Sequence, residues 1–562
     1  MRIRRFHGEI PRETPANLPG GYACHAVDVK LWRGRIEPFM QPRVVCELDD
    51  APCVVARVEG DPCCWTGSCD PCATFTESVG CYDTIRSEQG GHPEFLAGRG
   101  ADCACPDQWC RLGLPIPDGS PTLTGPESCT EHGTMRRYVF TFSRRFCDAE
   151  GAPGAPTNAV VMDTCDVAAT IDNIPQPPPD WCVDEINVYR LESTWDAHKG
   201  FKQAEGGDLP HSPYFDVHTE AEWFHVVTVP VGTTTIVDDL SPDELGRTLT
   251  TYDYFPPPEG LRIVGETTAG SLVGYLGNTL WFSERGLPHA WPPKHMMRFD
   301  DEIKRVAVDG STVFVATTSR PAVVSDQVDC DKPPCRSVAL GAPAAICSER
   351  SMTVHEGAAW WATREGYVTM GADAVVRRAT SQLFTPDDWR QLEPSTMQAV
   401  WHEGMLFFTT NVTAGYMDLE VSERPLGVVH LSSVPVQWYE DKAGVLYLLA
   451  DGKVLEWDAG PALMPYHWKS APDRLDGRKT ISAYKARLSE YCPDDKSGRK
   501  VSVTVSVDGR RVHSRSLNHS HPVRIRQARG IEWCFALTGT AVVDELHWAS
   551  TVRGLLKNET GS

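Results

Sequence analysis

The stretch GNTLWFSERG, residues 277–286, is the first of five similar segments on which the fold assignment depends. Each segment begins with glycine and soon enters a run of aromatic or β-branched residues. The others are GSTVFVATTSR (310–320), GAAWWATREG (357–366), GMLFFTTNV (404–412) and GVLYLLADG (444–452). Their first glycines lie 33, 47, 47 and 40 residues apart, and the four-stranded blades of β-propellers repeat every 40–45 residues or so, roughly this spacing. We therefore predict a β-propeller over residues 260–478, with a β-sandwich or meander of chance spacing as the alternative.

Short strand-like runs flank this repeat on both sides. RRYVFTFSRRF (136–146), INVYRLEST (186–194) and FHVVTVPVGTTTIVDD (224–239) precede it, with Pro-rich connectors between. Such runs, separated by turns, are typical of immunoglobulin or fibronectin type III sandwiches, and they predict one over residues 136–255. After the repeat, KVSVTVSVDGRRVHSR (500–515) carries Asp508-Gly509 between alternating runs, a strong hairpin pattern. It predicts a second sandwich over residues 479–562.

The predicted fold class is therefore all-β: a β-propeller with inserted or appended sandwich units and a Cys-rich insertion. Residues 1–45 are expected to form an arm and a hairpin, and residues 46–135 the insertion. Gly and Pro are spread along the whole chain, 46 and 43 in number, which suits many short strands joined by turns.

The Cys-rich segment can bury little apolar surface, so disulfides are the expected substitute for a core. Ten of the 20 cysteines are candidates there: Cys46, Cys53, Cys63, Cys64, Cys69, Cys72, Cys81, Cys103, Cys105 and Cys110. Elsewhere Cys330 with Cys335, and Cys492 with Cys534, are candidate local pairs, for which buried thiols are the alternative. A second hypothesis is zinc at Cys63, Cys64, Cys69 and Cys72. It fits less well, because no well-placed His completes a second pair of ligands.

The formal charge of −21 argues against a protein that grips DNA, which needs clustered Lys and Arg. Acidity repels DNA, or simply keeps the protein soluble. The N-terminal MRIRRFHGEIPRETP has no apolar stretch behind its basic residues, so it does not read as a secretory signal. No run approaches the ~18 apolar residues of a membrane helix. We expect a chain made in a cytoplasm, with no membrane segment.

Motifs of catalysis are missing from the sequence: there is no GxSxG elbow, no phosphate-binding GxxxxGK[ST] and no HExxH. A propeller hydrolase would need convergent acids, and the one local concentration is Glu284, Asp300, Asp301 and Glu302, which we interpret as a solvated loop. His519 and His521 lie in a polar turn. Trp281-Phe282 and Trp360-Trp361 are interpreted as core residues, since adjacent strand residues face opposite sides. We predict no catalytic residue, cofactor or metal.

Several segments occur together, in one order, in a known family. They are FHGEIPRETPANLPGGYACHAVDVKLWRGRIEPFMQPR (6–43), YVFTFSRRFCDAEGAPGAP (138–156), VPVGTTTIVDDLSPDELG…YDYFPPPEGLRIV (229–264), GYLGNTLWFSERGLPHAWPP (274–293), CSERSMTVHEGAAWWATREGYVTM (347–370) and LFTPDDWRQLEPSTMQAVWHEGMLFF (383–408). This collinear series resembles the nozzle proteins of podovirus tails, the tail tubular protein B family. The piece ending in Pro-His-Ala-Trp-Pro is the most specific, and the cysteine density of residues 46–135 departs from the family pattern.

The resemblance implies a structural subunit of a virion rather than an enzyme. Six copies would form a ring below the portal and its adaptor, which retains genomic DNA and later lets it pass. Such rings close through head-to-tail interfaces. Tail fibres or the tail tip are the other implied partners. The expected place is the virion tail, after synthesis in a bacterial cytoplasm, and disulfides would form once the particle leaves the reducing cell. The competing hypotheses are a tail-associated receptor-binding protein and a propeller glycan hydrolase.

Overall fold

The computed structural model describes residues 2–48, 52–58, 65–79, 82–96, 109–125, 132–162, 168–196, 222–327, 335–419, 424–489 and 499–557. Strands dominate these residues, and the two α-helices among them have six residues each, α1 (Pro386–Gln391) and α2 (Val552–Lys557). The predicted all-β fold class is confirmed. None of the described helices is long and apolar enough to span a membrane.

The propeller is built from four-stranded antiparallel sheets that follow one another along the chain. The first two are β20 (Arg262–Glu266), β21 (Leu272–Leu276), β22 (Thr279–Phe282) and β23 (Met297–Arg298), then β24 (Ile303–Asp309), β25 (Thr312–Thr317), β26 (Ala322–Gln327) and β27 (Cys335–Leu340). The next two are β28 (Thr353–His355), β29 (Ala358–Thr363), β30 (Gly366–Gly371) and β31 (Val376–Arg378), then β32 (Gln398–His402), β33 (Met405–Thr409), β34 (Ala414–Met417) and β35 (Val428–Leu431).

The repeated glycines lie in the hairpin turns of these sheets. Gly357 and Gly404 follow Glu356 and Glu403, and in both pairs the two residues have positive φ. Such turns match the twist of the flanking strands. Gly310, Gly357, Gly404 and Gly444 each precede the second strand of a sheet, whereas Gly277 precedes a third strand, β22. The equivalent turn in that sheet is at Gly270 (φ 82°). The interval between Gly277 and Gly310 is therefore short because Gly277 lies one turn later in its blade than the other four glycines do.

A strand from the N-terminal part of the chain completes the next sheet. β36 (Gln437–Glu440), β37 (Leu446–Ala450) and β38 (Lys453–Glu456) are followed by β5 (Arg43–Glu47), which pairs with β38. Strands more than 400 residues apart in sequence thus form one blade. The outer strand of this blade is therefore supplied by a segment that lies before all the other strands of the propeller in the sequence.

The described strands of the Cys-rich segment belong to the same ring of sheets. They are the hairpin β6 (Val54–Arg57) and β7 (Trp65–Ser68), and the sheet β8 (Thr74–Val79), β9 (Tyr82–Ser87), β10 (Glu94–Leu96) and β11 (Trp109–Arg111). β6 contacts β36, and β8 contacts β20. The innermost strands therefore run around the ring in the order β8, β20, β24, β28, β32, β36, β6.

Residues 122–238 form a two-sheet unit, here called the distal sandwich. One sheet holds β14 (Ala149–Glu150), β13 (His132–Arg144), β17 (Glu185–Asp196) and β18 (Phe224–Pro230), with β15 (Val160–Met162) beside β13. The other holds β12 (Thr122–Thr124), β16 (Ala169–Asp172) and β19 (Thr235–Asp238). Apolar side chains of both sheets, among them Phe140, Val188 and Ile171, meet in one core, as in a sandwich of aligned sheets.

The chain ends in a second unit, here called the C-terminal sandwich. Its strands are β39 (Tyr466–Ser470), β40 (Asp473–Leu488), β41 (Val501–Val507), β42 (Arg510–Leu517), β43 (Val523–Gly539) and β44 (Val543–Ala549), with β1 (Arg2–Ile3) on β44. Val501, Val503, Val505 and Val507 alternate with exposed or half-buried polar residues and face the core. The turn between β41 and β42 is Asp508-Gly509, with φ of 46° and 79°, as the hairpin pattern predicts.

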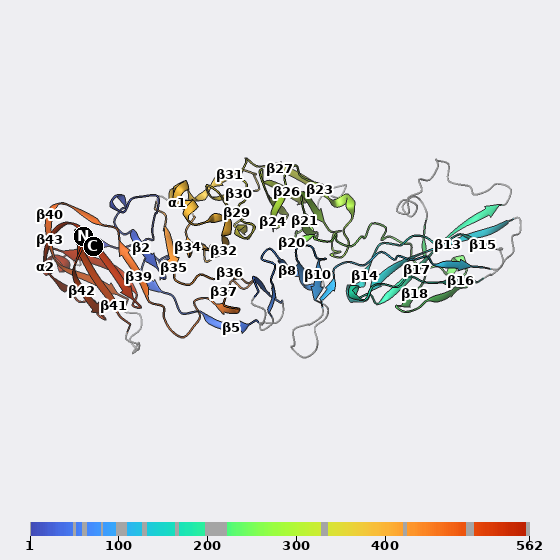
Figure 1. Ribbon diagram of the computed structural model, residues 1–562, viewed down its shortest axis with the longest axis horizontal. Coiled ribbons are helices and arrows are strands. Elements are labelled where there is room, and N and C mark those ends of the chain that lie inside the picture. Colours follow the sequence, from blue (N-terminus) through green and yellow to red (C-terminus); the bar gives the residue numbers. More distant parts are fainter. Residues whose placement is uncertain are drawn as a thin grey trace.

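The N-terminal arm joins this sandwich to the propeller. β2 (Ala23–Val27) lies between β39 and β35, and the resulting sheet of 12 strands runs from the C-terminal sandwich into a propeller blade. β3 (Val29–Lys30) and β4 (Glu37–Pro38) form a small hairpin beside it. Figure 1 shows the three units in a row, with both chain termini in the C-terminal sandwich and the distal sandwich at the opposite end.

Candidate functional site: the propeller axis and the sandwich junction

The innermost strands surround a cavity of about 220 Å³ at the propeller axis. Its wall combines residues from β6, β24, β32 and β36 with the chain before β8 and the turn before β28. The lining residues are Val54, Pro71, Cys72, Ala73, Arg305, Glu349, Arg350, Met352, Gln398, Ala399, Val400, Gln437, Trp438, Tyr439 and Glu440. The centre of a propeller is a common place for binding, so this cavity is the first candidate site.

Polar side chains of this wall hold the blades to one another. Gln398 bonds both the amide and the carbonyl of Trp438 (2.8 Å each), and Gln437 accepts from the amide of Val55 (2.8 Å). Ser348 donates to the carbonyl of Met397. These contacts link neighbouring blades whose inner strands have no ladder of backbone hydrogen bonds between them. These groups are therefore engaged in ring closure.

The charged side chains that line the cavity also form contacts within its wall. The Arg350 guanidinium donates to the carbonyls of Val436 (2.8 Å) and Cys53 (3.4 Å), and burial lowers its pKa from the ordinary value. Glu349 accepts from Arg262 (2.8 Å), and Glu440 lies 3.0 Å from His402. Both carboxylates are thus engaged by side chains of neighbouring strands, Arg262 on β20 and His402 on β32. This arrangement stabilises a closed wall.

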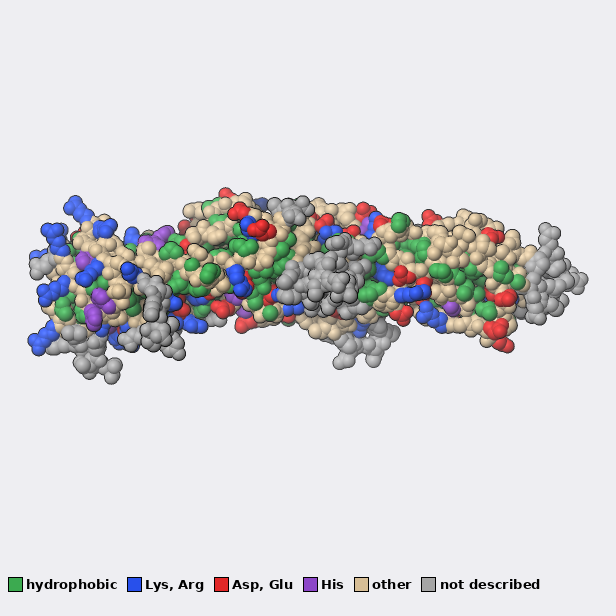
Figure 2. All heavy atoms as spheres, turned by 90° about the horizontal axis from the view of Figure 1, so that it is seen from below, with side chains coloured by type: hydrophobic (Ala, Val, Ile, Leu, Met, Phe, Trp, Pro, Cys, Tyr) green, Lys and Arg blue, Asp and Glu red, His purple; other side chains and the backbone are tan. Residues whose placement is uncertain are grey.

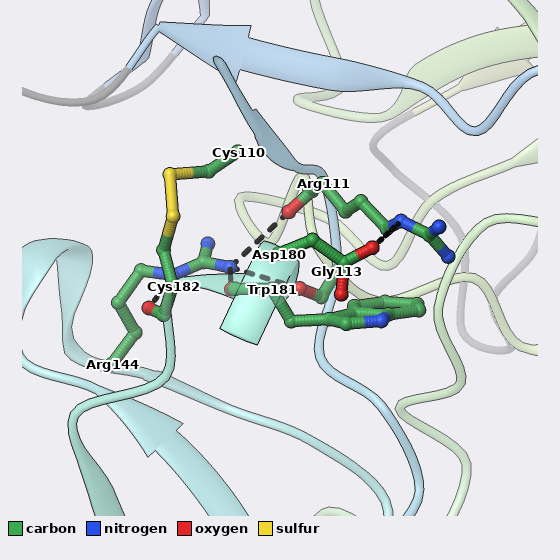
Figure 3. The surroundings of a disulfide bond; sticks show 7 residues. All are labelled: Cys110, Arg111, Gly113, Arg144, Asp180, Trp181 and Cys182. Carbon is green, nitrogen blue, oxygen red and sulfur yellow. Dashed lines mark hydrogen bonds and ion pairs between the residues drawn. A yellow bond between two sulfur atoms is a disulfide. The ribbon is translucent and has the colours of Figure 1, made fainter. Parts of the chain in front are cut away.

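A second candidate site is the junction between the distal sandwich and the propeller, where Arg144 is the central residue. Its side chain is buried (3% of the residue exposed) and lies 4.6 Å from the ring centre of Phe95. It donates hydrogen bonds to four backbone carbonyls, those of Arg111 (3.2 Å), Gly113 (3.0 Å), Trp181 (2.9 Å) and Cys182 (3.1 Å). Figure 3 shows this cluster. Burial lowers the pKa of Arg144, and the carbonyl dipoles replace the water that its charge loses.

A disulfide joins the same two units. Cys110 on β11 is bonded to Cys182, which follows the short 3₁₀ turn Pro179–Trp181 of the distal sandwich. Arg111 forms an ion pair with Asp180 (2.8 Å) beside the bond, as Figure 3 shows. The covalent bond, the ion pair and the Arg144 cluster connect β11 to the sandwich within a few residues. The junction is therefore held at several points rather than by a single linker.

The Pro-His-Ala-Trp-Pro segment, residues 288–292, lies at this junction as well. Trp291 is fully buried and packs with residues of β9, β10 and β20, while its ring N–H donates to Pro288 (2.9 Å). His289 is 3.2 Å from the carbonyl oxygen of Glu150 in the distal sandwich. Burial lowers the pKa of His289 to about 4, so the ring is neutral near pH 7. The most specific sequence motif thus forms a structural contact between two units.

The cysteines differ in part from the prediction. Cys110 is in a disulfide, but its partner is Cys182, which was not among the candidates; Cys147 is disulfide-bonded too. Cys53, Cys69, Cys72 and Cys534 carry free thiols, which corrects their assignment as disulfide cysteines. Cys46 lies on β5 and Cys335 begins β27. The remaining candidates lie outside the described residues: Cys63, Cys64, Cys81, Cys103, Cys105, Cys330 and Cys492.

The alternative zinc ligands and acidic residues are not brought together. Among the described residues no group of three or more His, Cys, Asp or Glu is placed to hold a metal ion, and Cys63 and Cys64 lie outside that set. Asp301 accepts from the amide of Arg320, and Glu302 pairs with Lys304 (2.7 Å). Glu284 lies 3.9 Å from His295. Neither Asp300 nor any of these three lines the axial cavity.

The aromatic pairs and the histidine turn have structural surroundings. Trp361 is buried and donates to the carbonyl of Ala344 (3.1 Å), while Trp360 packs edge-on against Trp401. Phe282 is buried below the guanidinium of Arg336, and Trp281 packs at the junction core. His519 and His521 lie with ring centres 5.1 Å apart in the turn after β42.

Sequence reasoning did not find Arg144 or Cys182. Arg144 lies in a strand pattern that predicts only alternation, and nothing local marks it as buried. Cys182 follows a Pro-rich connector, and its partner is 72 residues away. A disulfide partner at that separation depends on the tertiary fold, because sequence spacing alone does not restrict it.

Comparisons with known proteins give no family for this chain. No family model and no curated protein matches it. Among solved structures, Hsv2 of Kluyveromyces lactis is 9% identical with a TM-score of 0.25, covering 57% of this chain and 90% of its own. PorZ, a surface component of the type-IX secretion system of Porphyromonas gingivalis, is 11% identical with a TM-score of 0.26, covering 84% and 77%. The Cps50 β-propeller domain of Myceliophteria thermophila is 10% identical with a TM-score of 0.22, covering 43% and 93%. Similarities of this size carry no functional argument, and the propeller assignment rests on the sheets described above.

Proposed function

We propose that this chain is a structural subunit of a short phage tail, the nozzle ring below the portal and adaptor, which retains genomic DNA and then conducts it. The observation that carries the proposal is the arrangement of three β units in one elongated body, fixed to one another by shared strands and a multiply held junction. A tube wall that withstands internal pressure needs long subunits whose parts do not move independently.

The junction supports the same function. A receptor-binding tip or a catalytic lid would gain from mobility, whereas Arg144, the Cys110–Cys182 bond and Trp291 oppose movement between the distal sandwich and the propeller. The segments that resemble nozzle proteins include this junction and the strand β2 that joins the two other units. The resemblance therefore lies in parts of the chain that give the molecule its rigidity.

The test is electron microscopy of the purified chain, with mass photometry of the same sample. We expect closed rings of one size, alone or after addition of the portal and adaptor complex, and a mass that gives the copy number. Closed rings require a head-to-tail interface that returns on itself. A stable monomer that never assembles, even with the portal complex, would contradict the proposal and favour the receptor-binding or hydrolase alternative.

A further inference from the structure

The net charge of the chain conceals two regions of opposite sign. Residues 473–562 contain 16 Lys and Arg and 10 Asp and Glu, a formal charge of +6, so residues 1–472 carry −27. The basic region is the C-terminal sandwich without β39 and β1. Figure 2 shows Lys and Arg gathered at this end of the molecule, with several His beside them. The interpretation of the whole chain as unsuited to DNA therefore does not hold for this unit.

Most of these cations are exposed. The exposed basic residues of the unit are Arg474, Arg478, Lys479, Arg487, Arg499, Lys500, Arg510, Arg511, Arg515, Arg524, Arg526, Arg529 and Arg553. Exposed acidic residues are far fewer: among the described residues of the unit, only Asp476 and Asp508 are exposed. The two amide hydrogen bonds of Asp508, from Ile531 and Glu532, occupy one of its carboxylate oxygens within the hairpin.

Several of the arginines have no acidic partner. Within the described part of the chain, Arg511, Arg524 and Arg526 form no ion pair, although elsewhere exposed or half-buried arginines are commonly paired, as Arg145 is with Glu185 and Arg247 with Glu150. Arg524 and Arg526 alternate with the buried Val523 and Ile525 along β43. Their guanidinium groups are thus held on the outer face of the sheet.

Protection of a sheet edge accounts for only part of these charges. Charged residues on an edge strand hinder pairing with other chains, and β42, which pairs only with β41, is such a strand. β43 pairs with β41 and β39 only from Trp533 onward, and its earlier part, which holds Arg524 and Arg526, pairs with β40 alone. Edge protection therefore explains Arg524 and Arg526 as well as the charges of β42, but it does not explain Arg553 on α2 or Lys500, which precedes β41.

We propose that the outer surface of the C-terminal sandwich binds the phosphate backbone of double-stranded DNA without reading its sequence. Eleven of its 16 cations are arginine, whose planar fork forms paired hydrogen bonds with phosphate. The surface lacks the apolar anchors of a protein interface: of the large exposed hydrophobic residues in the described chain, Ile531 alone belongs to this unit. Nucleic-acid interfaces are polar and positively charged in this way.

The inference deepens the proposed tail function but needs only a single copy of the chain. In a ring of parallel copies, all basic sandwiches lie at the same end and repel one another. A polyanion at that end relieves the repulsion, while the acidic remainder of the chain, at −27, does not hold DNA. DNA would then be held at one end of the tube and pass the rest without adhesion.

The experiment measures binding of the full chain to a fluorescent random-sequence duplex by anisotropy, at several salt concentrations. We expect affinity to fall more than ~100-fold between about 50 and 200 mM salt, because each phosphate contact contributes about 0.9 to the slope of log affinity against log salt. The triple variant Arg511→Gln, Arg524→Gln, Arg526→Gln should lower that slope by up to about three. The matched control removes three exposed arginines of the propeller, Arg298→Gln, Arg364→Gln and Arg378→Gln, and should change nothing.

The outcomes separate the alternatives. Absence of binding at low salt, or an equal loss in both triple variants of unchanged melting temperature, would overturn the inference. Tighter binding of polyglutamate than of the duplex would overturn it in favour of an acidic protein partner. Rings that do not bind DNA would leave the tail proposal standing alone, and DNA binding by a chain that forms no rings would leave only this surface assignment.

Discussion

Arg144 and its neighbour Arg145 are the same residue type in different surroundings. They therefore allow the stabilising effect of a buried arginine to be compared with that of an exposed one. Arg144 donates to four carbonyls inside the junction, and Arg145 pairs with Glu185 in solvent (2.6 Å). Removal of a buried charge partner leaves polar groups unsatisfied, whereas exposed ion pairs contribute little. Identical substitutions at adjacent positions should therefore have very different effects.

We predict that Arg144→Met lowers the free energy of unfolding by about 3–5 kcal/mol, as for other broken buried charge clusters. Arg145→Met should change it by less than about 1 kcal/mol. Thermal and urea unfolding of the two variants measure the difference. A second readout is limited proteolysis, which should cut between β11 and β13 in the Arg144 variant alone. Equal stability of the two variants would show that the disulfide holds the junction without the arginine.

Glu9 gives a prediction about pH. Its carboxylate accepts from the amide of Ala26 (2.8 Å), and burial raises its pKa to about 7 from 4.5. The folded protein thus holds this proton to higher pH than the unfolded chain does. The stability from this group is complete below pH 4.5 and is lost as the pH rises through 7, a difference of about 3 kcal/mol at most.

Glu9→Gln keeps the acceptor without the charge, so it should flatten the pH dependence of stability between pH 4.5 and 7 and raise the melting temperature at pH 8. Glu13→Gln, an exposed position on the same arm, is the control and should keep the profile of the unaltered protein. Melting curves over this pH range measure both. An unchanged profile in Glu9→Gln would mean that the carboxylate is solvated when charged.

At the scale of the element, the bond between Cys110 and Cys182 links β11 to the turn before β17 of the distal sandwich, across 72 residues. Closing a loop of this length restricts the unfolded chain and contributes about 4 kcal/mol by the chain-entropy model. We predict that the pair of substitutions Cys110→Ser and Cys182→Ser lowers the urea midpoint of the distal sandwich. Cys534→Ser, which removes a free thiol, should leave it unchanged. Equal urea midpoints in both variants would show that the disulfide does not stabilise the junction and that its hydrogen bonds are sufficient.

The strands also show which structural features a local sequence pattern can predict. Asp508-Gly509 and the glycines before β25, β29, β33 and β37 occupy turns because positive φ is required there. The segment at Gly277 fits the same pattern but lies one strand later in its blade. A sequence pattern can identify a strand and the turn before it. The position of that strand within the sheet depends on which strands it pairs with.

At the scale of the whole molecule, the sheet of 12 strands makes the C-terminal sandwich and the propeller one unit. We predict two calorimetric transitions: one for the distal sandwich, and one shared by the propeller and the C-terminal sandwich. Hydrogen exchange should give β2, β39 and β35 similar protection, since they are adjacent strands of one sheet. Separate melting of the C-terminal sandwich would show that β2 does not couple the two units.

Features that depend on neighbouring residues in the chain could be predicted from the amino-acid pattern. These are the all-β class, the hairpin turns, and the alternation that buries Val501, Val503, Val505 and Val507. Each follows from the two-residue period of a strand or from the conformational freedom of glycine, both of which are local properties.

The tertiary structure alone decided the partners. It placed β5 in the last blade, β2 between two units, Cys110 beside Cys182 and Arg144 among four carbonyls. It also gathered the arginines of one unit on one end of an acidic molecule. The physical reason is that backbone groups of any two strands can pair equally well, so the choice among distant partners rests on the packing of the whole chain.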